Sequence, residues 1–202
     1  MKVVKNKKLV IAITGPIGSG KTIVLDYLSQ QGYPTISADK INQQLLTKKS
    51  HIKKINKLLF QTKSNTLNKT AIRELIFKDK TKKKLLESYL HPLIIKEITK
   101  KLAKSTKTTF IEVALLYESD FNLKVDLVMA VIASEALIIE RIEKRDAISR
   151  TLIKEILANQ KSISFLKKEA DVIINNEKTR RETFQQLDQF LKQLRGDNNG
   201  DL

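Results

Sequence analysis

The chain has 202 residues, no cysteine and a formal net charge of +16, with 41% hydrophobic and 30% charged residues. These values are typical of one globular domain with a small appended subdomain at most, and they exclude disulfides, thiolate metal sites and thiol catalysis. The two histidines cannot form a zinc site by themselves, and no apolar run approaches the roughly 18 residues that a membrane span needs.

The N-terminal stretch MKVVKNKKLVIAITG is basic and then apolar, as a signal peptide would be. Its apolar part, residues 8–14, instead continues into a glycine-rich loop and lacks a small-residue cleavage pattern. We therefore interpret 8–14 as a strand buried on both faces of a parallel sheet, and we expect a cytoplasmic protein.

The loop after this strand has the pattern Gly-x-x-x-x-Gly-Lys-Thr, which begins at Gly15 and ends at Thr22. It follows a predicted strand and opens a predicted helix over 22–32, as phosphate-binding loops do. Lys21 is expected to reach the β- and γ-phosphates of ATP, and the Thr22 hydroxyl to bind Mg²⁺. A glycine-rich turn without a ligand is the alternative. The backbone N–H groups expected to surround the phosphates are those of Gly18, Ser19, Gly20, Lys21, Thr22 and Ile23.

A second strand is predicted at 33–37, and Asp39 follows it within a few residues. The carboxyl ends of parallel strands face one crevice, so Asp39 is a candidate base that accepts a proton from an attacking hydroxyl. The alternative is a helix N-cap, because a helical pattern begins just after it.

Residues 40–105 are predicted to be almost entirely helical and lysine-rich, with interruptions near 62–69 and at His91 and Pro92. Lysines are scattered along the whole chain, and aromatic residues make up only 5% of it. A compositional lysine bias therefore explains the charge better than a dedicated nucleic-acid surface.

Three further strands are predicted at 108–116, 125–133 and 170–176, followed by an amphipathic helix over 180–196. Glu112 is a candidate for the outer shell of a magnesium ion, or a strand-end carboxylate without that role. Arg141 and Arg145 lie one helical turn apart after the strand at 125–133. Their guanidinium groups are candidates to clamp phosphates, and an exposed, salt-bridged helix face is the alternative.

Seven segments together resemble the dephospho-coenzyme A kinase family, in the family's order and over nearly the whole chain. They are ITGPIGSGKTIV, YPTISADKI, LNKTAIRELIFKD, YLHPLIIKEI, FIEVALLYES, RIEKRD with the following ANQ, and KKEADVIINN.

The resemblance implies an α/β P-loop fold like that of nucleoside monophosphate kinases, with a five-stranded parallel sheet in three layers. The nucleotide-binding core would comprise 1–39, 106–133 and 170–202, the helical acceptor-binding subdomain 40–105, and the lid 134–169. The implied reaction moves the γ-phosphate of ATP, with Mg²⁺, to the ribose 3′-hydroxyl of dephospho-coenzyme A. It yields coenzyme A and ADP in the final step of coenzyme A biosynthesis.

The family's motifs also assign roles to residues. Asp39 matches the presumed base, Arg141 and Arg145 match arginines of the lid, and the acceptor would contact Lys69, His91 and Pro92. The partner implied is the small molecule dephospho-coenzyme A, with no specific nucleic acid and no membrane, and the protein is expected to be a monomer or a weak homo-oligomer.

Several positions depart from the family pattern, so a divergent member is expected. They are Ser37, Gln43, Lys69, Ala114 and Ile156. Lys69 keeps a positive charge without the bidentate fork of arginine, and Ile156 removes a guanidinium from the lid. Two alternatives follow: a P-loop ATPase stimulated by nucleic acid, prompted by the charge, and a nucleotide-binding protein with degraded catalysis, prompted by these departures.

Overall fold

The computed structural model describes residues 8–118 and 122–196 of the chain. Two compact units are present: one comprises the residues up to Ile36 and those from Lys104 onward, and the other comprises Ser37–Ala103.

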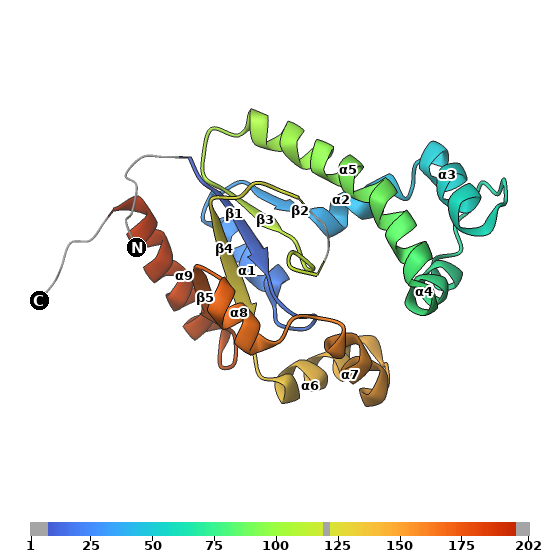
Figure 1. Ribbon diagram of the computed structural model, residues 1–202. Helices are drawn as coiled ribbons and strands as arrows, with labels where there is room; N and C mark the ends of the chain where they lie inside the picture. The colour runs from blue at the N-terminus through green and yellow to red at the C-terminus, as the bar shows by residue number, and fades with distance from the viewer. Residues whose placement is uncertain (1–7, 119–121, 197–202) are drawn as a thin grey trace, which may run out of the picture. The chain divides into compact units, whose positions relative to one another are not determined.

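A five-stranded parallel sheet forms the centre of the first unit (Figure 1). Its strands are β1 (Val10–Thr14), β2 (Thr35–Ser37), β3 (Thr109–Glu112), β4 (Leu127–Ile132) and β5 (Val172–Asn175), in the spatial order β2-β3-β1-β4-β5. The register places Ile13 of β1 beside Glu112 of β3 and Met129 of β4. The predicted parallel sheet is thus confirmed, although β3 is shorter than the strand expected at 108–116.

Both faces of the sheet are apolar, which explains the continuous hydrophobic runs of the strands. On β4, Met129 and Val131 belong to the large core cluster, while Ala130 and Ile132 pack on the opposite face. The helices α1 (Lys21–Gln30) and α9 (Arg180–Arg195) contribute to the large cluster, and α8 (Ile163–Glu169) covers the other face. The alternation of side chains along each strand therefore builds three layers.

The helices α1 and α9 pack against each other through one aromatic pair. The rings of Tyr27 and Phe184 are stacked with centroids 4.1 Å apart. The Tyr27 hydroxyl also donates a hydrogen bond of 2.5 Å to Asp188, and burial together with this acceptor raises the pKa of Tyr27 to about 12. The C-terminal helix expected at 180–196 is thereby anchored to the helix that follows the phosphate loop.

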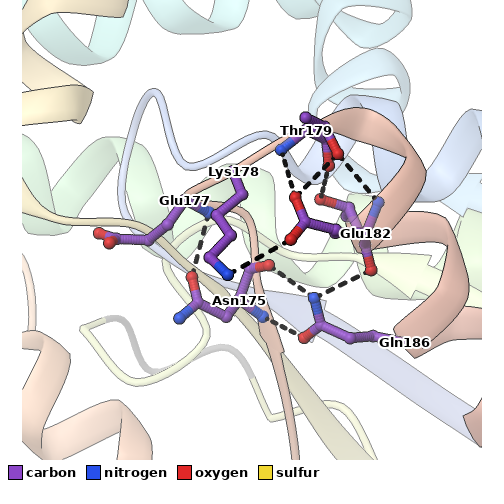
Figure 2. A network of polar contacts seen from close by, with 7 residues as sticks. Asn175, Glu177, Lys178, Thr179, Glu182 and Gln186 are labelled. Atoms are coloured by element: carbon purple, nitrogen blue, oxygen red, sulfur yellow. Dashed lines mark hydrogen bonds and ion pairs between the residues drawn. The ribbon is translucent and has the colours of Figure 1, made fainter.

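The turn between β5 and α9 is fixed by a polar network (Figure 2). Thr179 and Glu182 form a capping box, in which each side chain bonds to the backbone of the other residue. The Gln186 side chain exchanges two hydrogen bonds of 2.8 Å with the backbone of Asn175. These contacts set the position at which β5 ends and α9 begins.

Two further helices of the first unit, α6 (Glu135–Asp146) and α7 (Arg150–Ala158), share a small apolar cluster. Ile138, Ile142 and Ile153 form its buried centre, and Ile17 of the phosphate loop packs against it. One member of the loop is therefore held by the segment predicted to be the lid.

The second unit contains α2 (Ala38–Leu45), α3 (Lys49–Phe60), α4 (Lys69–Lys78) and nearly all of α5 (Lys80–Lys104). The predicted interruption near 62–69 is present as the loop between α3 and α4, where the Asn56 amide donates to the carbonyls of Ser64 and Thr66.

The interruption predicted at His91 and Pro92 is wrong, because α5 continues through both residues. Proline removes one backbone donor there, but buried side chains recur every four residues on one face, at Leu86, Leu90, Ile94 and Ile98. The packing of that face outweighs one missing hydrogen bond.

Within the two described ranges, no helix has both the length and the apolar character needed to cross a membrane.

Candidate active site

The phosphate loop connects the central strand β1 to α1 at the carboxyl edge of the sheet, between β3 and β4. Gly15 and Gly20 adopt φ angles of +143° and +101°, in the region that favours glycine. A Cβ atom at Gly15 would lie 2.2 Å from the Val131 carbonyl oxygen, and one at Gly20 would lie 2.0 Å from the side-chain nitrogen of Asn176. Both glycines are therefore required by their neighbours as well as by their backbone angles.

Lys21 is buried at the start of α1, with only 8% of its surface exposed. Its ammonium group donates hydrogen bonds of 2.8 Å and 2.9 Å to the carbonyls of Gly15 and Pro16. The side chain thus folds back over the loop, and its charge is held at the loop itself.

Two of the N–H groups expected in the phosphate cradle bond within the backbone. Ser19 donates to Pro16, and Ile23 donates to Gly20. The first N–H groups of any helix lack acceptors within the helix, so the start of α1 still offers donors to an anion. The Thr22 side chain in this first turn is exposed.

Two buried polar atoms, one in the loop and one beside it, have no hydrogen-bond partner among the described residues: the Ser19 hydroxyl and Nη1 of Arg141. Buried donors without partners are costly, and phosphate oxygens are suitable acceptors for both. The loop and its neighbourhood therefore fit a phosphate-bearing ligand.

The structure places the two candidate arginines differently. Nη2 of Arg141 donates a 2.8 Å hydrogen bond to the carbonyl of Asn176. Because the Asn176 side chain lies against Gly20 of the phosphate loop, this bond places the guanidinium close to the loop. Arg145 is exposed and forms a bidentate pair with Asp146, which raises the pKa of Arg145 and lowers that of Asp146. Arg141 is held near the phosphate loop, whereas the contacts of Arg145 are those of a salt-bridged surface.

The candidate metal ligands are Thr22 and Glu112. Glu112 ends β3 beside Ile13 of β1 and is buried, with 8% exposure. The described residues hold no group of three or more side chains able to bind a metal ion. Magnesium commonly takes only one or two protein ligands and completes its shell with water and substrate phosphates, so a hydroxyl and a carboxylate at this edge fit that ion.

Asn176 is a residue that the motif reasoning did not single out. It follows β5, is 3% exposed, and its side-chain nitrogen donates a 2.8 Å hydrogen bond to the carbonyl of Ser19 in the loop. Two signals were available: a pair of amides at the carboxyl end of a predicted strand, where parallel strands present their functional side chains, and the place of Asn176 as the last residue of the segment KKEADVIINN.

The remaining candidates lie in the second unit. Asp39 is exposed in the first turn of α2, and the N-cap of this helix is Ser37, whose hydroxyl accepts from the Lys40 N–H. Asp39 is therefore not the N-cap, which removes that alternative.

Lys69 is the exposed first residue of α4. His91 and Pro92 lie within α5, where His91 is half-buried and Pro92 is exposed.

Two solved structures resemble this chain over nearly its whole length. The chain aligns with a Thermus thermophilus protein at a TM-score of 0.83 and 24% identity, covering 94% of this chain and 99% of that one. It also aligns with a dephospho-CoA kinase from Campylobacter jejuni at a TM-score of 0.67 and 27% identity, covering 95% and 100%. Both solved structures are matched over nearly their full length, so this chain shares their fold in its sheet and in its helical segments.

Sequence comparison assigns the family. The chain is 35% identical over 194 residues to a dephospho-CoA kinase of Helicobacter pylori, which covers 93% of this chain and 98% of that relative. The dephospho-CoA kinase family model matches residues 9–182, from the start of β1 into α9. This chain therefore belongs to the dephospho-CoA kinase family of P-loop kinases.

Proposed function

We propose that this enzyme transfers the γ-phosphate of ATP to the ribose 3′-hydroxyl of dephospho-coenzyme A, giving coenzyme A and ADP, the final step of coenzyme A biosynthesis. The observation that carries the proposal is the phosphate loop at the carboxyl edge of β1 in a chain that the family model matches from 9 to 182. Phosphoryl transfer depends on positioning and on electrostatic stabilisation, and a loop of this kind supplies both.

The loop has the task of holding the triphosphate. Backbone donors at the start of α1 bind the phosphate oxygens, and Lys21 exchanges its carbonyl partners for the β- and γ-phosphates. When bound, Mg²⁺ neutralises part of the phosphate charge. Thr22 and Glu112 are the residues that would hold it.

Asp39 has the task of accepting the proton. As the 3′-hydroxyl oxygen bonds to the γ-phosphorus, the bond from that phosphorus to the β–γ bridging oxygen breaks, and the hydroxyl proton passes to the Asp39 carboxylate. An exposed carboxylate that does not cap its own helix is available for this role.

Two arginines and three acceptor-side residues complete the proposal. Arg141 stabilises the charge on the transferred group, and Arg145 does so after leaving its surface pair with Asp146. Lys69, His91 and Pro92 contact dephospho-coenzyme A. The domain roles proposed are a core formed by 1–39, 106–133 and 170–202, an acceptor-binding subdomain at 40–105 and a lid at 134–169.

We further propose that the enzyme acts in the cytoplasm as a monomer or weak homo-oligomer, on a small-molecule acceptor and without nucleic acid or membrane. The scattered lysines and the low content of aromatic residues, 5%, support only the part of this proposal that concerns nucleic acid, because single-strand binders use aromatic side chains for base stacking.

A panel of acceptors tests the reaction. Purified enzyme with Mg²⁺ and ATP is incubated with dephospho-coenzyme A, with adenosine, with RNA, or with no acceptor, and products are identified by mass spectrometry. Coenzyme A is the matched control, because it differs from the substrate only by the phosphate already at the 3′ position. We expect ADP and coenzyme A to form together only with dephospho-coenzyme A. Hydrolysis of ATP that rises with RNA and gives no phosphorylated acceptor would contradict the proposal.

A further inference from the structure

Asn176 lies at the junction of four segments that are far apart in the sequence. Its N–H donates to the Ile132 carbonyl at the end of β4, and its carbonyl accepts from Arg141 of α6. Its side-chain oxygen accepts a 2.9 Å hydrogen bond from the hydroxyl of Thr183 in α9, and its side-chain nitrogen donates to the Ser19 carbonyl of the phosphate loop. A buried amide with all these contacts has one orientation.

The orientation of this amide is fixed by chemistry as well as by packing. The Ser19 carbonyl can only accept a hydrogen bond, so the nitrogen of the amide must face it. Thr183 is fully buried and directs its hydroxyl to the remaining oxygen at 2.9 Å, while the Thr179 carbonyl lies farther from that hydroxyl at 3.3 Å. Thr183 therefore holds the amide in the orientation that the loop requires.

The contact with Ser19 sets the direction of a loop donor. The carbonyl of Ser19 and the N–H of Gly20 belong to one peptide group, and no peptide between described residues is cis. In a planar trans peptide these two groups point in opposite directions. By holding the carbonyl on its own side, Asn176 turns the Gly20 N–H away from itself. The missing side chain of Gly20 lets the amide approach this closely.

We propose that Asn176 is a positioning residue for phosphoryl transfer, which orients the Ser19–Gly20 peptide of the phosphate loop through its side chain and Arg141 through its carbonyl. The inference rests on the proposed function, since both groups serve the triphosphate there. Asn176 is expected to act on the affinity and alignment of ATP, and to leave the binding of the acceptor unchanged.

The first test is the variant Asn176→Asp, which keeps the shape of the side chain and replaces the donor by a carboxyl group. When ionised, this group repels the Ser19 carbonyl. When protonated, it can donate to Ser19 and accept from Thr183, as the amide does. We expect KM for ATP to rise roughly tenfold to a hundredfold at neutral pH, in keeping with the loss of a buried hydrogen bond, with KM for dephospho-coenzyme A unchanged. The ratio of kcat/KM between variant and wild type should increase as the pH is lowered.

The matched control is Asn175→Asp, at the exposed neighbouring residue (Figure 2). It adds the same charge at nearly the same place, and its side-chain oxygen can still accept from the Glu177 N–H. Wild-type KM for ATP is expected for this variant. An equal rise of KM for ATP in both variants would show that the added negative charge alone weakens ATP binding, and would overturn the inference.

A second variant keeps the proposal testable if Asn176→Asp does not fold. Thr183→Val retains the volume of the side chain but removes the donor that orients the amide, whereas Thr183→Ser retains that donor. We expect Thr183→Val to raise KM for ATP several-fold and Thr183→Ser to leave it near the wild-type value. Lower kcat with unchanged KM for ATP in Asn176→Asp and Thr183→Val would mean a merely structural role. If the wild-type enzyme transfers no phosphate to dephospho-coenzyme A, the proposed function fails; in that case, calorimetric titration with MgATP still measures the Asn176 effect independently.

Discussion

Gln160 joins Ile17 across 143 residues of sequence: its side-chain oxygen accepts a hydrogen bond of 3.0 Å from the Ile17 backbone N–H. Ile17 belongs to the phosphate loop, and Gln160 follows α7. The same loop residue packs against the apolar cluster of α6 and α7. One polar and one apolar contact thus dock the predicted lid on the loop.

Replacement of Gln160 by alanine is expected to loosen this docking, because it removes the acceptor and leaves the apolar contact of Ile17. We predict faster tryptic cleavage within residues 140–165 in the ligand-free variant than in the wild type, and protection of this segment in the wild type when ATP and dephospho-coenzyme A are both present. Limited proteolysis followed by mass spectrometry measures both effects. The control is Asn159→Ala, whose amide donates to the Glu155 carbonyl of its own helix. Equal cleavage rates in the two variants would contradict the role of Gln160.

Replacement of Gly20 by alanine is expected to cost more stability than the same change at Gly32. Both residues have positive φ angles, +101° and +81°, so both variants carry the backbone strain of about 1–2 kcal/mol. Only at Gly20 does the new Cβ meet another group, at 2.0 Å from the Asn176 side chain, whereas nothing lies within 4 Å at Gly32. Urea unfolding should give a lower free energy of unfolding for Gly20→Ala than for Gly32→Ala. Calorimetry with MgATP should show weaker binding for Gly20→Ala alone. Equal unfolding free energies would show that the close contact costs nothing.

The sheet and the phosphate loop could be predicted from the sequence because their signals are local. A strand buried on both faces has a continuous apolar run in the sequence, and the eight-residue loop pattern marks where the strand gives way to the helix. The C-terminal helix was predictable for the same reason, since its apolar positions Leu187, Phe190 and Leu191 are buried as the helical spacing requires.

The contacts of the site could not be predicted, because they join residues that are distant in the sequence. Asn176 and Ser19 are separated by 157 positions, and nothing local to either one shows that they meet. The helix through His91 and Pro92 was missed for a related reason. Proline signals a break locally, and the buried face of α5, which overrides that signal, is visible only in the folded unit.

Replacement of Asp39 by asparagine is expected to lower kcat by roughly 10²–10⁴-fold, the usual contribution of a general base, because the amide cannot accept the hydroxyl proton. The affinity for MgATP should remain, since Asp39 has no role in the phosphate cradle. Initial rates of coenzyme A formation and calorimetry with MgATP test the two parts separately. Asp26→Asn, an equal charge change on an exposed residue of α1, serves as the control and should retain full turnover. Undiminished turnover in Asp39→Asn would exclude this residue as the base.

Replacement of Tyr27 by phenylalanine is expected to change how stability depends on pH. Burial, and then the hydrogen bond and charge of Asp188, raise the pKa of Tyr27 from 10.0 to about 12. In the window between these values the unfolded tyrosine has lost its proton and the folded one has kept it, so stability falls as the pH rises from 10 to 12 and is fully present below 10.

The phenylalanine variant lacks this ionisation and also lacks the hydrogen bond to Asp188. At pH 8 it should be less stable than the wild type by about 1.5–3 kcal/mol, the usual value of a hydrogen bond to a charged group. The difference in unfolding free energy between the two proteins should then shrink as the pH rises from 10 to 12, because only the wild type loses stability through this group. The other tyrosines are common to both proteins and cancel in the comparison. Urea unfolding at several pH values measures the difference, and a gap that stays constant above pH 10 would mean that Tyr27 titrates as an ordinary tyrosine.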